Sequence, residues 1–149
     1  MSMFSGMGIT SSALTAQRLR MDVISSNMAN ADTTRATFEN GQWQPYRRKT
    51  VVLEPKNNSF SSHLQSAMGG GKVSGGVKVT RINEDDTPFK LVYDPENPDA
   101  NQDGYVSLPN VDPLREMVDL MSATRSYEAN VTVFNASKSM MMKALEIGK

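Results

Sequence analysis

The feature that most limits how this chain can fold is its C-terminal segment, where residues 113–147 form one uninterrupted helical pattern. Asp112 is a good N-cap residue, Pro113 suits the first helical position, and Glu116 favours the positive end of the helix dipole. A straight helix over this segment would be roughly 50 Å long. A compact chain of 149 residues has a diameter of only about 40 Å. The helix must therefore project, bend or pair outside a globular body.

The apolar positions of this helix follow alternating three-and-four spacing, which predicts a partner helix packed along it. The stripe contains Met117, Leu120, Thr124, Tyr127, Val131, Phe134, Lys138, Met141 and Leu145, of which Thr124 and Lys138 are the exceptions to the apolar pattern. The natural partner is a second helix within residues 1–34, a segment without proline. That segment shows two apolar stripes, which indicates contacts on more than one side. One stripe is therefore expected to remain for neighbouring subunits.

The middle of the chain, residues 35–111, holds most of the prolines and glycines, and its pattern predicts short strands. The β-prone stretches are 46–54, 77–80 and 89–93. Residues 55–72 predict a long mobile loop. We therefore expect an α+β fold in which the terminal helices, within 1–34 and 112–149, pair as a coiled-coil-like helical domain beside a small β-rich central domain.

Composition and missing motifs exclude several classes of protein. The 16 basic residues equal the 16 acidic ones, so charge gives no reason to expect a nucleic-acid partner. The absence of cysteine excludes disulfides and thiolate sites. No apolar run is long enough for a membrane span, and no cleavable secretory signal is expected. His63 has no neighbouring metal ligand or catalytic partner. We therefore expect no enzyme activity, cofactor or small-molecule substrate.

The segment 99–104 resembles the start of a calcium loop. Its twelfth position is Asn110, which cannot supply the bidentate carboxylate of such a loop. The alternative is a hydrogen-bonded polar turn in which Gly104 takes a positive φ. The polar turn is the favoured interpretation.

Two further polar patterns have alternative interpretations. Asn27 and Asn30 lie three residues apart at the end of the first helix. They either belong to a polar helix terminus, or their side-chain amides hydrogen-bond to backbone groups of adjacent helices. The basic run of Tyr46, Arg47 and Arg48 is either a solvated strand face or a salt-bridged subunit contact, and we take it as a candidate contact patch.

Several motifs resemble the flagellar rod and hook family. Asn27-Met28-Ala29-Asn30 is similar to its Asn-x-Ala-Asn signature, and Arg125-Ser126-Tyr127-Glu128-Ala129-Asn130 is similar to its Arg-x-Tyr-x-x-Asn helix. Further similar segments, close to those of proximal rod members, are 45–49, 97–101, 104–106 and 109–111. The resemblance spans nearly the whole chain except 38–44 and 55–72.

The resemblance implies a structural subunit of the bacterial flagellar basal-body rod, which transmits torque and lines the wall of the export channel. It implies a position outside the cytoplasmic membrane, reached through the flagellar type III apparatus without a cleaved signal peptide. The implied partners are other flagellar rod proteins, the adapter FliE, further copies in a helical assembly and, transiently, the export apparatus. The alternative is a cytoplasmic coiled-coil adaptor or chaperone of the export system.

Ten residues of the terminal helices are expected to form subunit contacts. The predicted apolar knobs are Met117, Leu120, Tyr127, Val131, Phe134 and Met141. The predicted polar contacts, which would set the register between helices, are Asn27, Asn30, Arg125 and Asn130.

Overall fold

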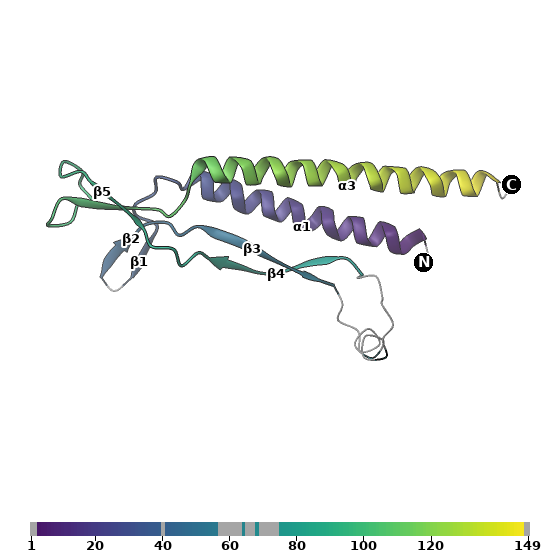
Figure 1. Cartoon of the computed structure of the whole chain (residues 1–149), viewed down its shortest axis with the longest axis horizontal. Coiled ribbons are helices and arrows are strands. Elements are labelled where there is room, and N and C mark those ends of the chain that lie inside the picture. Colours follow the sequence, from purple (N-terminus) through teal and green to yellow (C-terminus); the bar gives the residue numbers. More distant parts are fainter. Residues whose placement is uncertain (1–2, 40, 57–63, 65–67, 69–74, 148–149) are drawn as a thin grey trace. The chain divides into compact units, whose positions relative to one another are not determined.

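The computed structural model describes residues 3–39, 41–56, 64, 68 and 75–147. This part of the chain contains two long helices and short paired strands, which confirms the α+β prediction (Figure 1). None of its helices is both long and apolar enough to cross a membrane. The chain divides into two compact units. The first unit comprises Met1–Leu19, Val52–Arg81 and Ala123–Lys149, and the second comprises Arg20–Val51 and Ile82–Ser122.

Helix α3 (Pro113–Ile147) has the bounds predicted from the sequence. Asp112 caps it, because the backbone N of Leu114 donates to Asp112 Oδ1 at 3.1 Å. The backbone N of Glu116 donates to the Asp112 carbonyl at 3.0 Å and begins the helical hydrogen bonds. The local signals that start a helix therefore act here as expected.

Helix α1 (Met3–Ala29) ends where polar side chains begin to compete for its backbone. Asn30 Nδ2 donates to the Ser26 carbonyl at 2.9 Å, and the backbone N of Ala31 donates to the Met28 carbonyl at 3.3 Å. The bond from Ala31 gives the Met28 carbonyl in the last turn a partner, whereas the Ser26 carbonyl also accepts from the backbone N of Asn30 at 3.2 Å.

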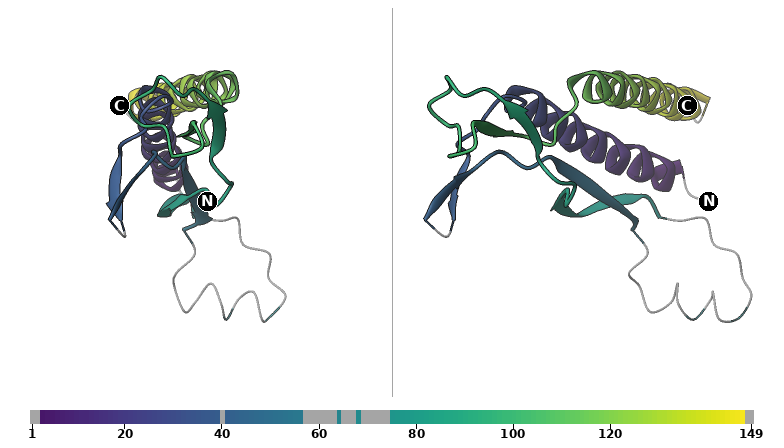
Figure 2. Two further views of the ribbon diagram at one scale, coloured as in Figure 1. Left: turned by 90° about the vertical axis from the view of Figure 1, so that its left-hand side faces the viewer. Right: turned by 60° about the vertical axis from the view of Figure 1, so that its left-hand side comes forward.

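Six strands pair in twos within the described residues. They are β1 (Thr37–Glu39), β2 (Gln42–Gln44), β3 (Lys49–Pro55), β4 (Val77–Glu84), β5 (Lys90–Tyr93) and β6 (Tyr105–Leu108). The pairs β1–β2 and β5–β6 are antiparallel, and β3 pairs with β4. Figure 2 shows the β1–β2 hairpin, coloured blue, from two further sides. His63 lies outside the described residues. The predicted loop over 55–72 also lies outside them, except for residues 55, 56, 64 and 68.

The hydrophobic core of each unit is small. The buried apolar side chains of the second unit include Val23, Ile24, Tyr46, Val106, Val111, Pro45 and Pro109, and those of the first include Ala16 and Ala123. Both antiparallel strand pairs leave large aromatic rings exposed. In each of them, two directly opposed residues form one edge-to-face ring pair. These pairs are Phe38–Trp43 and Tyr93–Tyr105. So little buried apolar surface makes specific polar contacts important for the fold.

Replacing Gly76 by alanine should lower the free energy of unfolding by about 2 kcal/mol, measured by chemical denaturation. Gly76 has φ +112°, and an added Cβ would lie 2.4 Å from Ser12 Oγ. That hydroxyl also accepts a hydrogen bond from the backbone N of Val77 at 3.1 Å. The matched control is Gly8→Ala, because Gly8 lies in α1 with open space at its Cβ position. It should be neutral or stabilising, and an equal loss at both sites would contradict the prediction.

Candidate assembly site

The most connected buried side chain of the second unit is Asn27, which is only 1% exposed. Its Nδ2 donates to the Lys49 carbonyl at 2.8 Å, and its Oδ1 accepts from the Lys49 backbone N at 2.9 Å. Its Oδ1 also accepts from the Tyr46 hydroxyl at 3.1 Å, and its Nδ2 donates to Glu116 Oε2 at 3.1 Å. These bonds use the full hydrogen-bonding capacity of a carboxamide. Asn27 thereby joins α1 to the first residue of β3 and to α3.

The carboxylate of Glu116 is fully buried, and Arg48 balances its charge. Arg48 Nε donates to Glu116 Oε1 at 2.6 Å. The guanidinium also lies 3.5 Å from carboxylate oxygens of Asp85 and Asp119. Burial lowers the pKa of Arg48, but hydrogen bonds and charge interactions with Glu116 and Asp85 outweigh it, so the pKa is raised overall. A buried carboxylate is tolerated only when it is paired and hydrogen-bonded, and Glu116 meets both conditions.

A further asparagine, Asn110, fixes the segment that precedes α3. Its Oδ1 accepts from the Arg48 backbone N at 2.8 Å, and its Nδ2 donates to the carbonyls of Asp85 at 3.0 Å and Thr87 at 3.1 Å. This contribution of Asn110 was not predicted from the sequence, in which it stands as an unsuitable calcium ligand and within the rod-like segment 109–111. We call Asn27, Arg48, Asn110 and Glu116 the polar junction. It holds four separate segments of the second unit together.

The three residues of the candidate contact patch, Tyr46, Arg47 and Arg48, make contacts within the chain. Tyr46 is 8% exposed and bonds Asn27, while the Arg48 side chain is 13% exposed and lies in the polar junction. The Arg47 guanidinium lies 4.6 Å from the centre of the Phe89 ring. These contacts are internal to the chain. The carboxylates that pair with Arg48 belong to the same chain and come from segments that are distant in its sequence. A subunit contact through Tyr46, Arg47 or Arg48 stays a prediction.

The four predicted polar contacts lie in different environments. Asn27 bonds a strand backbone and Glu116 within its own chain, rather than the backbone of an adjacent helix. Asn30 lies at the partly exposed end of α1 and accepts from the Thr33 hydroxyl at 3.2 Å. Arg125 is exposed, and the half-buried Asn130 donates to a carbonyl one turn earlier at 2.8 Å. Contacts of Asn27, Asn30, Arg125 and Asn130 with other subunits stay predictions.

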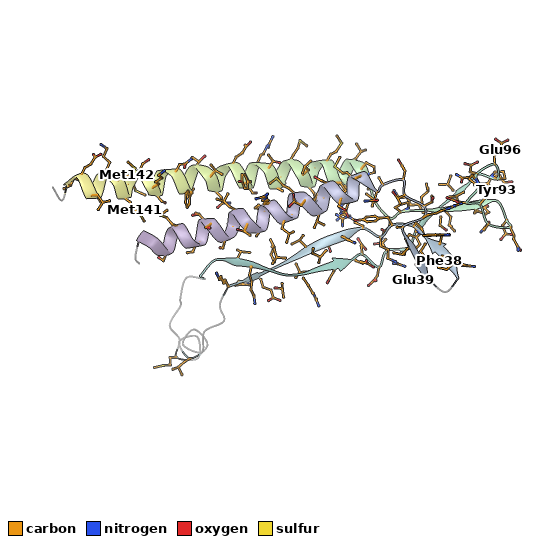
Figure 3. All side chains as sticks on the ribbon, turned by 180° about the vertical axis from the view of Figure 1, so that it is seen from behind. Phe38, Glu39, Tyr93, Glu96, Met141 and Met142 are labelled. Atoms are coloured by element: carbon orange, nitrogen blue, oxygen red, sulfur yellow. The ribbon has the colours of Figure 1, made fainter. Side chains whose placement is uncertain are left out.

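The predicted apolar knobs of α3 fall into two groups. The half-buried ones are Leu120, Tyr127, Val131, Phe134 and Met141. Figure 3 shows Met141 and its neighbour Met142, which leave α3 in different directions, and Met142 is 55% exposed. The remaining knob, Met117, is 50% exposed. Its contact with another subunit stays a prediction, as do those of the half-buried group.

Met117 belongs to an apolar stripe on the exposed side of α3 that the sequence analysis did not separate from the inner one. We call this the outer stripe, and its members are Leu114, Met117, Val118 and Met121. They recur at the three-and-four spacing of one helix face, and all four are at least half exposed. Glu116 lies on the buried side of the same helix. Four adjacent apolar side chains on an exposed face form a candidate surface for another molecule.

Away from the polar junction, Asp99 connects the 97–100 turn to the segment that follows α1. The Thr34 hydroxyl donates to Asp99 Oδ2 at 2.6 Å, and Arg35 forms an ion pair with Oδ1. The hydrogen bond from Thr34, followed by that from Arg35, lowers the pKa of the Asp99 carboxyl. Within the described part of the chain, no group of three His, Cys, Asp or Glu side chains could hold a metal ion.

The following turn has the geometry of the polar-turn interpretation. Asn101 Oδ1 accepts from the backbone N of Asp103 at 3.0 Å and of Tyr105 at 2.9 Å. Gly104 has φ +79°, which confirms the predicted positive φ. Because protein N–H groups close the turn, no ion is needed to hold it.

Acid should weaken the contact between Asp99 and the Thr34–Arg35 segment. The pKa of Asp99 lies below its ordinary value of 3.8 in the folded chain, so ionised Asp99 stabilises the fold above pH 3.8. That contribution is lost as the pH falls from about 3.8 toward the folded-state pKa. Asp99→Asn should therefore flatten the decline of stability below about pH 4, measured by urea unfolding at pH 7 and pH 3. Asp103→Asn, in the following exposed turn, is the control, and equal flattening by both variants would contradict the assignment.

Comparisons with known proteins agree with the motifs at both ends of the chain. Residues 7–37 match the family model described as flagella basal body rod protein, and residues 102–147 match that of flagellar basal body rod FlgEFG protein C-terminal. The chain is 65% identical to the flagellar basal-body rod protein FlgC of Bacillus subtilis over all of both chains. It is 46% identical to the FlgC of Borreliella burgdorferi over 99% of this chain and 98% of the relative. It is 48% identical to that of Salmonella typhimurium over 95% and 94%. The chain therefore belongs to the flagellar basal-body rod protein FlgC family.

Proposed function

We propose that this chain is a structural subunit of the proximal part of the flagellar basal-body rod. The observation that carries the proposal is its 65% identity, over the full length of both chains, to a protein named for that rod. The relatives in the other bacteria carry the same name. This argues against the alternative of a cytoplasmic adaptor or chaperone.

The mechanical part of the proposal rests on α3. A continuous helix of 35 residues with an exposed apolar stripe can pack against helices of neighbouring subunits by fitting side chains into grooves. Each such contact is weak, but the contacts are repeated in every subunit, so their contributions to the stability of the assembly add up. We infer that these contacts give the rod its stiffness for transmitting torque and form the wall of the export channel. The segments 1–34 and 112–149 would supply the rod core, and 35–111 would form a separate central region.

The polar junction has a different task in this proposal. Its hydrogen bonds lie within one chain, so it fixes how the second unit holds the start of α3. The outer stripe then stays available for other rod subunits, further copies of this chain and the adapter FliE. Export through the flagellar type III apparatus without a cleaved signal peptide, to a site outside the cytoplasmic membrane, is part of the same proposal.

The test is an in-frame deletion of the gene, complemented from a plasmid and examined by electron microscopy. The deletion strain should lack hooks and filaments, and the plasmid should restore them. Fractionation should then find the protein in purified basal bodies. Hooks and filaments in the deletion strain, with no second gene copy present, would contradict the proposal. A protein found only in the cytoplasmic fraction of the complemented strain would support the adaptor alternative instead.

A further inference from the structure

Two polar contacts join the end of α1 to the start of α3 within the second unit. Asn27 Nδ2 donates to Glu116 Oε2 at 3.1 Å, and Arg20 Nη2 donates to Asp119 Oδ1 at 3.4 Å. The later residue of α1 meets the earlier residue of α3, so the two segments run antiparallel. Arg20 and Asn27 are one heptad apart, which places both on the same face of α1. The two contacts therefore lie along one seam between the helices.

The apolar side chains of this seam are compatible with more than one axial position of the helices. Val23, which is 9% exposed, lies between Arg20 and Asn27 at three-and-four spacing. On α3 the half-buried Leu120 is followed one heptad later by the half-buried Tyr127. Sliding one helix by a heptad, about 10 Å, thus brings an apolar side chain opposite an apolar one again. The apolar pattern alone leaves the register open.

The polar contacts do not repeat with the heptad. One heptad after Glu116 and Asp119 the chain has Ala123 and Ser126, and neither of these side chains carries a charge. A shift that brings them opposite α1 would therefore take both carboxylates away from their partners on that helix. Glu116 is fully buried, and a buried carboxylate that loses a partner is strongly unfavourable.

A shift in the opposite direction fails at the other residue of α1. It would bring Arg20 opposite Glu116, but it would bring Asn27 opposite Pro109, which lies before the start of α3. Asn27 is only 1% exposed, and its amide would lose the carboxylate to which it donates. The observed register is therefore the one in which both side chains of α1 have a carboxylate on α3.

We propose that these four residues select the register of α1 against α3 in the second unit. We call Arg20, Asn27, Glu116 and Asp119 the register key. Polar residues in helical seams specify register at a cost in stability. A slip of one heptad would move the outer stripe by about 10 Å along the second unit, so the register decides where that surface is presented. The inference concerns the free chain and does not rest on the proposed function.

Arg20 and Asp119 give the seam a second point of contact beyond the polar junction. Their side chains are 35% and 32% exposed, and an ion pair this exposed changes the stability of the fold little. An equilibrium between two registers with similar apolar contacts responds even to a small preference. The pair should favour the observed register by about twofold to fivefold. Arg20 and Asp119 are therefore positioning residues rather than sources of stability.

The register of the purified full-length chain can be measured with two spin labels. The chain has no cysteine, so Ala29→Cys and Met121→Cys direct one label to an exposed position on each helix. Double electron–electron resonance then gives the distribution of distances between the labels, which should contain one narrow distance. The matched control, Arg18→Leu with Arg115→Leu, removes two exposed charges outside the register key and should keep that distance. Several distances in the chain with an intact key would overturn the proposal.

The main variant replaces all four residues of the register key by leucine. Replacing a whole buried ionic cluster by apolar residues is often neutral or stabilising, and Arg48 keeps Asp85 at 3.5 Å. The circular dichroism should therefore stay helical, while a second distance of comparable population appears. A single distance equal to the original one would show that apolar contacts set the register. Loss of the helical signal would show that the four residues hold the fold instead, and either result overturns the proposal.

A rescue variant tests the ion pair by itself. Asn27→Leu with Glu116→Leu keeps Arg20 and Asp119 as the only polar members of the register key. It should lower the population of the second distance about twofold to fivefold relative to the four-leucine variant. An unchanged population would overturn the assignment of Arg20 and Asp119 as positioning residues.

Discussion

Replacing Asn27 by alanine should lower the free energy of unfolding by about 3 kcal/mol. The variant leaves the Lys49 backbone N and carbonyl and one Glu116 oxygen without the partner that Asn27 supplies. A buried polar group that loses its partner costs about 1–3 kcal/mol, and an exposed group costs less. Urea unfolding of the purified chain, followed by circular dichroism, measures the change.

Two further variants sharpen this test. Asn30→Ala removes the other asparagine of the same motif, which bonds the Ser26 carbonyl at the exposed helix end, and should cost less than about 1 kcal/mol. Asn27→Asp keeps the shape but replaces the Nδ2 donor by an acceptor that faces Glu116. It should destabilise at least as much as Asn27→Ala at pH 7, because two carboxylates would then lie together. Similar losses for Asn27→Ala and Asn30→Ala would show that the polar junction is not what holds the second unit.

Replacing Val118 by glutamate should abolish motility while leaving the stability of the free chain unchanged. Val118 is 61% exposed, and substitutions at such positions usually change the free energy of unfolding by less than about 0.5 kcal/mol. In an assembled rod the new carboxylate would be buried against an apolar neighbour without a partner, which is strongly unfavourable. The measurements are swimming in soft agar and urea unfolding of the same variant.

The control for this substitution adds the same charge elsewhere. Gln102→Glu changes an exposed residue in the turn before β6 and should leave both swimming and stability unchanged. Normal swimming of the Val118→Glu strain would mean that the outer stripe does not contact neighbouring subunits. Loss of swimming together with unfolding of the purified variant would place Val118 in the fold instead.

Local signals made the helices predictable. The bounds of α3 follow from Asp112, Pro113 and a long heptad pattern, all of which act within a few residues of one another. The strands β3, β4 and β5 lie within or beside the predicted β-prone stretches. The strands β1 and β2 were missed, because strands of three residues are too short to show an alternating pattern. The strand β6 was missed as well, although β5, which also has four residues, lies in a predicted stretch.

The polar junction shows why the site could be predicted only in part. Asn27 was selected from its motif, but its partners Lys49 and Glu116 lie 22 and 89 residues away. Arg48 could pair with any of 16 acidic residues, and the sequence gives no rule for choosing Glu116, 68 residues later. The same limit applies to the outer stripe, because a periodic pattern does not say which side of α3 another element covers.

The sequence by itself determined the class of fold, the length of α3, the positive φ of Gly104 and, through its motifs, the protein family. These depend on local preferences or on the order of short segments. Only the tertiary structure decided that Asn27 pairs with a strand backbone, that Glu116 is buried against Arg48 and that Met117 and Val118 stay exposed. The physical reason is that pairing and burial depend on which distant segments meet, and many such meetings are compatible with one pattern of apolar and charged residues.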